Sequence, residues 1–287
     1  MTPYVFDDTP CKLGEGPLWH PTRQQFFWFD IQGQQLLTRV QDTTTAWDFD
    51  ETLSAAAWVD NDRLLLATES AFELFSIDSG ETEFVAPLES DNAMTRSNDG
   101  RADPYGGFWI GTMGKSAERK AGAIYRYYRG EVRKLFPNIS IPNAICFSPD
   151  GTYAYFTDSA VGNIMRQALD DRDGWPSGEP EIFIPAGVPL ATPDGAVVDA
   201  DGNLWNAEWG GWRVACYSPT GEFLKDIKLN AAHTTCPAFG GADLTTLFCT
   251  SATENVSPDN LAQSDDHGKT FAVDNVAKGQ AEHQVIL

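Results

Sequence analysis

Short strand-like runs that end in a small or polar residue recur along the whole chain. Each begins with aromatic or aliphatic side chains, as a buried β-strand does. The six runs are Phe27–Asp30, Leu65–Thr68, Trp109–Thr112, Tyr155–Asp158, Trp205–Glu208 and Phe248–Ser251. Their last residues are 38 to 50 positions apart, which is close to the length of a four-stranded propeller blade. The pattern therefore predicts six repeats of one sheet unit.

The segments between these runs predict hairpins. Turns rich in Asp, Asn and Gly, such as 148–151 and 199–202, precede the runs and suit β-turns. Glycine or proline interrupts nearly every window that could hold a long helix, which argues against alternating strands and helices. We therefore expect an all-β, six-bladed β-propeller with four-stranded antiparallel blades, forming a single domain over residues 1–287. Terminal strands at 4–6 and 284–287 would share a sheet and close the ring.

Charge and cysteine usage narrow the range of partners and compartments. The chain has 41 acidic and 20 basic residues and a net charge of −21, which disfavours binding to nucleic acid or an anionic membrane surface. No obligate protein partner is evident. The five cysteines show no CxxC spacing and are expected to be buried free thiols. With no secretory signal and no membrane-length apolar run, the expected location is cytoplasmic.

Common catalytic signatures are absent from the sequence. It contains no GxSxG, HExxH, P-loop or helix-opening GxGxxG motif. The four histidines have no metal-ligand spacing, so a zinc site made of imidazoles is disfavoured. We expect each histidine to lie on the surface or in a loop.

Four polar segments stand out because acidic or amide side chains interrupt glycine- or proline-containing turns. They are residues 13–17, 96–100, 141–144 and 192–195. In a propeller, all four would meet at one end of the central channel. Two carboxylates and two amides there would form an oxygen-rich site suited to Ca²⁺, Mg²⁺ or Mn²⁺. Each segment alone is also an ordinary turn sequence, so this convergence is a hypothesis.

Taken together and in order, these motifs resemble the senescence-marker-protein, gluconolactonase and regucalcin family of six-bladed propellers. The resemblance covers nearly the whole chain. The motifs that carry it are Leu13–Trp19, Asn98–Pro104, Trp109–Met113, Pro142–Ala144 with Ser148–Gly151, Pro193–Gly195, Glu208–Gly211 and Thr235–Gly241.

The resemblance implies metal-dependent hydrolysis of a sugar lactone to its aldonic acid. Glu15, Asn143 and Asp194 match positions that bind one divalent ion, which could be Ca, Zn, Mn, Mg or Fe. Arg96 and Asn98 match positions that face the substrate. The ion would act as a Lewis acid, and Asp194 would be both ligand and general base.

Other residues near these motifs have less definite roles. Glu118 is the nearest candidate for an acidic residue that contacts the sugar in some relatives. Asp99 is expected to anchor a turn or a strand end. Trp19 and Trp209 could line the channel mouth, but we expect both to pack in the core.

Two alternatives to a sugar lactonase remain open from the sequence. Six-bladed propellers with a channel metal also hydrolyse other esters or phosphotriesters. Some relatives named regucalcin suggest instead a calcium-binding or sugar-binding regulator without turnover. A small-molecule sugar lactone is the one partner that the sequence predicts.

Overall fold

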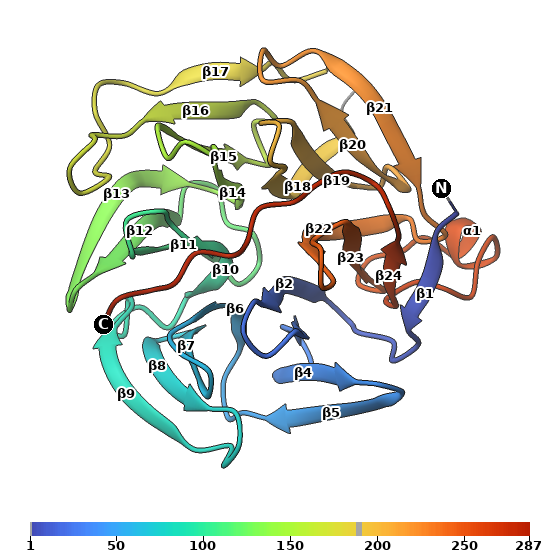
Figure 1. Ribbon diagram of the computed structural model, residues 1–287, viewed down its shortest axis with the longest axis horizontal. Helices are drawn as coiled ribbons and strands as arrows, with labels where there is room; N and C mark the ends of the chain where they lie inside the picture. The colour runs from blue at the N-terminus through green and yellow to red at the C-terminus, as the bar shows by residue number, and fades with distance from the viewer. Residues whose placement is uncertain (1, 188–190) are drawn as a thin grey trace.

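Antiparallel β-sheets are arranged around a central axis in the computed structural model, which describes residues 2–187 and 191–287 (Figure 1). The first sheet holds β2 (Gly14–His20), β3 (Gln25–Asp30), β4 (Gln35–Val40) and β5 (Thr43–Asp48). The second holds β6 (Leu53–Trp58), β7 (Arg63–Thr68), β8 (Ala71–Ser76) and β9 (Thr82–Pro87). The third holds β10 (Thr95–Ala102), β11 (Phe108–Gly114), β12 (Gly122–Tyr128) and β13 (Glu131–Ile139). The fourth holds β14 (Pro142–Phe147), β15 (Tyr153–Asp158), β16 (Ile164–Ala168) and β17 (Glu181–Ile184).

The other eight strands form one larger sheet. One half holds β18 (Thr192–Val198), β19 (Leu204–Trp209), β20 (Arg213–Tyr217) and β21 (Phe223–Lys228). The other half holds β22 (His233–Gly240), β23 (Thr246–Ala252), β24 (Thr270–Val273) and β1 (Tyr4–Asp7). The strand pairing between the halves is limited to one residue pair, Trp209 with His233, and hydrogen bonds between Glu208 and Thr234 add to it. The fold is thus an all-β propeller with four-stranded antiparallel blades, but its sheets number five where the sequence predicted six separate ones.

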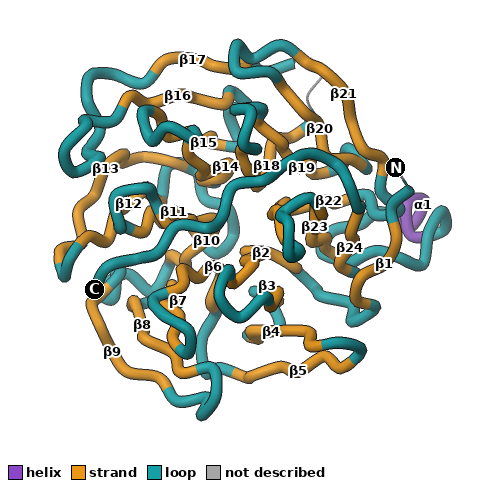
Figure 2. The backbone as a smooth tube through the Cα atoms, viewed as in Figure 1, coloured by secondary structure: helices purple, strands orange, loops and turns teal. Residues whose placement is uncertain are grey.

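The repeat predicted from the hydrophobic runs is present at the level of strands. All six runs lie in the second strand of a four-stranded set, from β3 to β23. The first strands adjoin one another in the order β2, β6, β10, β14, β18 and β22, and β22 adjoins β2. These first strands therefore surround the central channel. Figure 2 shows that loops connect the strands and that α1 (Pro258–Leu261) is a short helix at the edge.

The core lies between neighbouring sheets, and β3 shows why the chain forms this arrangement. Its alternate side chains point to opposite faces. Phe27 and Phe29 pack with residues of β6 to β8, whereas Phe26 and Trp28 pack in a cluster with Phe248 of β23. Because both faces are covered, the strand is hydrophobic at successive positions and lacks the simple alternation of a half-exposed strand.

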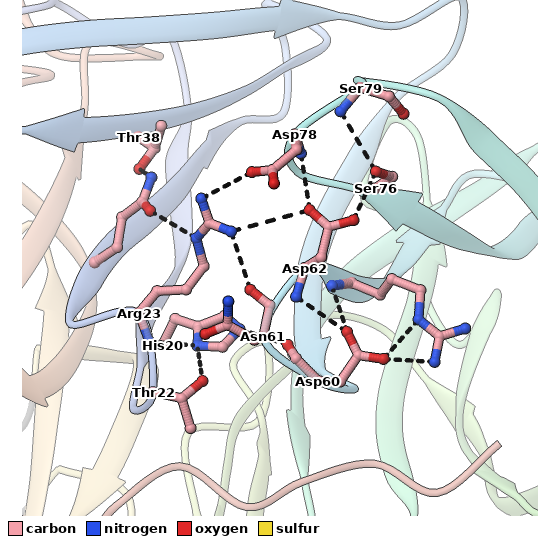
Figure 3. A network of polar contacts seen from close by, with 12 residues as sticks. His20, Thr22, Arg23, Thr38, Asp60, Asn61, Asp62, Ser76, Asp78 and Ser79 are labelled. Atoms are coloured by element: carbon pink, nitrogen blue, oxygen red, sulfur yellow. Dashed lines mark hydrogen bonds and ion pairs between the residues drawn. The ribbon is translucent and has the colours of Figure 1, made fainter.

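Polar contacts join adjacent sheets at their turns, as Figure 3 shows for the β2–β3 and β6–β7 turns. Arg23 donates to the Asn61 carbonyl and to Asp78, both at 3.0 Å. His20 Nε2 lies 2.9 Å from the Asp60 carbonyl oxygen. His20 is fully buried, so the expectation of a surface or loop histidine is wrong here, because the ring fills the seam between two sheets. The prediction is also wrong for His233, which is buried in β22, whereas His267 is buried but lies in a loop, as predicted.

The chain ends differ from the predicted closure in one respect. The N-terminal strand β1 pairs with β24, the last strand, so the first and last strands share a sheet, although β24 ends at Val273. Residues 284–287 do not form the expected strand. They belong to a C-terminal segment that crosses the face of the ring and ends on its far side (Figure 1), where its hydrogen bonds go to several different sheets.

All five cysteines are buried and free, as the sequence predicts. Within residues 2–187 and 191–287, no helix is long and apolar enough to span a membrane.

Candidate active site

Five predicted site residues line one cavity at the end of the ring where the first strands begin. Glu15 is the second residue of β2, Asn143 the second of β14 and Asp194 the third of β18. Arg96 and Asn98 lie near the start of β10. All five are buried, and the cavity has a volume of about 370 Å³. Residues from four separate strands therefore meet in one place, as the hypothesis of convergence requires.

An irregularity in each of these first strands turns the polar side chains toward the channel. The strand register shifts directly after Glu15, Asn143 and Pro193, and between Ser97 and Gly100. Such β-bulges redirect side chains and are frequent beside active sites.

Two of these bulges are held by contacts with neighbouring strands, one through a close backbone approach and the other through side-chain hydrogen bonds. Gly16 has a φ of +53°, and a Cβ there would lie 2.2 Å from the Ser54 carbonyl oxygen, so glycine is required. In β18, the Asn206 side chain donates to the backbone carbonyls of Asp194 and Gly195 at 2.9 and 3.1 Å. The backbone that carries both carboxylates is thereby held in place.

The carboxylates of the cavity lack enough positive charge around them. Burial, followed by repulsion from Asp99, raises the pKa of Glu15 to about 8. Burial and repulsion from Glu15 and Asp99 raise the pKa of Asp194 well above its usual range. Arg96 opposes both shifts but does not offset them. Clustered buried carboxylates disfavour ionisation unless a cation joins them.

A chain of hydrogen bonds connects the amide side chains with the arginine. Arg96 Nη1 donates to Asn98 Oδ1 at 2.9 Å, and Asn98 Nδ2 donates to Asn143 Oδ1 at 3.0 Å. Asn143 Nδ2 donates to Ser159 Oγ at 2.9 Å, and this hydroxyl donates to the Pro193 carbonyl at 2.6 Å. The Asn143 amide is thus fixed with its nitrogen toward Ser159, which leaves a lone pair of its oxygen for a further partner.

The donor set fits a divalent cation. Glu15, Asp194 and Asn143 offer two carboxylates and one amide oxygen, the ligands that hard cations prefer. The raised pKa values of the two carboxyl groups also favour a bound cation, because its positive charge would stabilise their ionised forms. The described residues contain no group of three or more His, Cys, Asp or Glu side chains arranged to hold a metal. A site here therefore needs the Asn143 oxygen as its third protein ligand.

Comparison with known proteins places the chain in a family. A model of the SMP-30/Gluconolactonase/LRE-like region matches residues 13–253. The chain belongs to this family. The matched segment contains Glu15, Asn143 and Asp194, and it begins just before β2 and ends just after β23.

Relatives in the SMP-30/gluconolactonase/LRE-like family resemble the chain over almost its full length. A Rhizobium meliloti (strain 1021) protein provisionally named sugar lactone lactonase is 40% identical over 97% of this chain and 95% of its own. The L-arabinolactonase of Azospirillum brasilense is 36% identical over 96% and 92%. The crystal structure of a calcium-binding protein, regucalcin, from Agrobacterium tumefaciens str. C58 has a TM-score of 0.95 and 41% identity, covering 99% of this chain and 97% of the other.

Not every residue implied by the family resemblance reaches the cavity. Glu118 is absent from its lining, and the Glu118 carboxylate accepts a hydrogen bond from the Ser116 backbone at 3.0 Å. The loop folds back on itself, and its neighbours Lys115 and Ser116 line the cavity instead. The substrate contact predicted for Glu118 therefore gains no support from the geometry.

The structure also adds lining residues that sequence reasoning missed. Trp209 was expected in the core, and it packs against the buried cluster of Leu13, Ile31 and Ala252. It is only half-buried, however, and it also lines the cavity, stacked on His233 with ring centroids 3.9 Å apart. Trp19 packs in the core as expected. Gln32 and Glu254 come from loops whose sequences carry no distinctive motif. The Glu208–Gly211 motif was the one available signal for Trp209.

Proposed function

We propose that the protein hydrolyses a sugar lactone to the corresponding aldonic acid with one divalent ion bound by Glu15, Asn143 and Asp194. The chain is an enzyme of the hydrolase class that acts on sugar lactones, in keeping with its family and with relatives named as lactonases. The ion, its ligands and the roles below are our inference.

The observation that carries the proposal is the pair of buried carboxylates, Glu15 and Asp194, facing one cavity with raised pKa values. Such a pair is unfavourable in the ionised form without a cation. A cavity of about 370 Å³ is within the range of small-molecule sites. Together they favour an ion-dependent reaction on a compact polar substrate.

A bound ion would supply Lewis-acid polarisation of the lactone carbonyl. Asp194, as general base, accepts a proton from the attacking water. Arg96 and Asn98 hold the ring oxygens or hydroxyls of the sugar by directed hydrogen bonds. In the structure, Arg96 Nε is buried and has no hydrogen-bond partner among the described residues, so a donor is available for substrate.

We also infer that the eight-stranded sheet functions as two blades, because the strand pairing between its halves is limited to one residue pair. The ring then has six blades, and residues 1–287 form one domain.

A second candidate function is divalent-ion binding without turnover. It is favoured by one observation, the 41% identity to a structure described as a calcium-binding protein. The two candidates differ in whether the ion supports hydrolysis.

Metal removal and a lactone panel test the proposal. Purified protein is depleted with a chelator, its metal content is measured, and hydrolysis of arabinono-, xylono-, galactono- and gluconolactone is followed in a pH-stat. We expect activity to fall to the spontaneous rate and to return with Ca²⁺, Mg²⁺, Mn²⁺, Zn²⁺ or Fe²⁺. Full activity of metal-free protein contradicts the proposal, and tight ion binding without turnover on any lactone favours the second candidate.

A further inference from the structure

The C-terminal strap, residues 274–287, crosses one face of the ring (Figure 1). It is held where the first strands end. The Gln280 side chain donates to the carbonyls of Phe147 and Val198 at 3.2 and 2.9 Å. Trp58 Nε1 donates to a strap carbonyl at 2.8 Å. Since the predicted ligands lie where the first strands begin, the strap and the cavity occupy opposite ends of one channel.

A buried ion pair connects the strap with the channel interior. Glu282 projects from the strap and binds the guanidinium of Arg101. The two side chains are 7% and 10% exposed. Arg101 lies on β10, and a charge buried this deeply requires a partner of opposite sign. Glu282 provides that partner from outside the first strands.

Arg101 also joins three first strands of the ring. Its Nη2 donates to the carbonyls of Ala196 on β18 and Pro237 on β22, both at 3.3 Å. Ala196 is two residues beyond Asp194. The guanidinium therefore fixes the distance between β10 and β18 at Ala196, two residues after the predicted ligand Asp194.

The same guanidinium acts on the site through its charge. Arg101 is two residues after Asp99 on β10, and its charge attracts the Asp99 carboxylate. Asp99 in turn accepts a hydrogen bond from the Ile145 backbone at 2.7 Å, on the strand that carries Asn143. Arg101 thus contacts β18 and β22 directly, and it acts on β14 through Asp99.

We propose that Glu282 is a positioning residue for the metal site: by holding Arg101 in the channel, the strap fixes the spacing of the strands that carry Asn143 and Asp194. This inference rests on the proposed function. Groups that orient metal ligands without touching the ion change its affinity by about 10- to 100-fold when removed. A strap that only covered the ring would change stability and leave affinity unaltered.

Glu282→Gln is the variant that tests the proposal. It keeps a hydrogen-bond acceptor of nearly the same shape and removes the charge that holds Arg101. The matched control is Gln280→Ala, which removes two strap contacts without touching Arg101. Mn²⁺ binding to the metal-depleted full-length proteins is measured by electron paramagnetic resonance, and thermal unfolding is recorded alongside.

We expect Glu282→Gln to raise the Mn²⁺ Kd roughly tenfold, and Gln280→Ala to lower Tm while leaving Kd within twofold. Glu282→Asp keeps the charge on a shorter side chain and is expected to shift Kd by less than Glu282→Gln. This third variant also serves as the test if Glu282→Gln does not fold, in which case a Kd raised more than in Gln280→Ala supports the proposal.

Equal Kd values for wild type and Glu282→Gln, or an equal rise in Gln280→Ala, overturn the positioning role and leave the proposed function intact. Wild-type protein that binds no Mn²⁺ or other divalent ion contradicts both.

Discussion

The two ends of the channel bury charge in opposite ways. At the cavity end, burial raises the pKa values of Glu15 and Asp194, and repulsion from Asp99 adds to both shifts. At the strap end, the carboxylate of Glu282 is paired with Arg101. The carboxylate and the guanidinium at the strap end neutralise each other, whereas at the cavity end the charge of Arg96 does not offset the burial of the carboxylates. In the same fold, the buried charges at the strap end are already paired, whereas a bound cation would stabilise the carboxylates at the cavity end.

The largest expected effect comes from removing a carboxylate at the cavity end. Asp194→Asn removes a metal ligand and the proposed base, so we expect kcat/KM on the preferred lactone to fall at least about 10³-fold. Asp201→Asn, at an exposed turn between β18 and β19, is the matched control and is expected to retain wild-type activity. Circular dichroism verifies folding. Activity of Asp194→Asn within tenfold of wild type contradicts its assignment.

Breaking the ion pair at the strap end is expected to destabilise the protein more than breaking an exposed ion pair at the cavity rim. Arg101→Met leaves Glu282 buried without a partner, which is expected to lower the free energy of unfolding by about 3–5 kcal/mol. Lys115→Met breaks the rim ion pair with Glu69, whose side chains are 40% and 22% exposed, and is expected to cost less than about 1 kcal/mol. Urea unfolding measures both. Similar losses in the two variants would remove the contrast between the ends.

The cavity end predicts a pH dependence of ion affinity. Without an ion, the pKa of Glu15 is raised to about 8, and only the deprotonated carboxylate binds a cation. Below about pH 8 protons compete with the ion, so affinity falls as pH falls, by up to about tenfold per pH unit for one displaced proton.

Calcium titrations at pH 6, 7, 8 and 9 measure this dependence. We expect Kd to decrease from pH 6 to pH 8, because the Glu15 carboxyl loses its proton in this range. Equal Kd values at pH 6 and 8 would show that Glu15 is already ionised in the ion-free protein.

The smallest effect is expected for Glu118→Gln. The family resemblance implies a substrate contact for Glu118, whereas the geometry does not. Because its carboxylate accepts from the Ser116 backbone and lies outside the cavity lining, Glu118→Gln is expected to change KM by less than about twofold, since no substrate hydrogen bond is lost. Steady-state kinetics on the preferred lactone measure it. A KM raised fivefold or more would restore the substrate contact that the resemblance implies.

The local hydrophobic pattern was sufficient to predict the second strand of each set, but not the path of the C-terminal segment across the ring. The hydrophobic runs mark the second strand of every set because a strand covered on both faces is recognisable from its own residues. Residues 284–287 also look like a strand, yet their hydrogen-bond partners are backbone groups at the ends of distant strands. No periodicity within the segment carries that information.

The site was predictable where its residues lie on strands and unpredictable where they lie on loops. Glu15, Asn143 and Asp194 sit at fixed positions on first strands, so the propeller repeat brings them to one end. Glu118 lies on a loop, whose path depends on its own hydrogen bonds. Trp209 ends β19 and does both, packing against a buried cluster and lining the cavity, and the sequence pattern favoured only the core position because most tryptophans are largely buried.

The central claim is that Glu15, Asn143 and Asp194 share one divalent ion. Crystals of the metal-depleted protein soaked in Mn²⁺, with diffraction recorded at the manganese absorption edge, test it most directly. The account predicts one strong anomalous peak within about 2.3 Å of oxygens from all three side chains. An empty cavity beside fully ordered carboxylates, or a peak bound elsewhere in the channel, would contradict it.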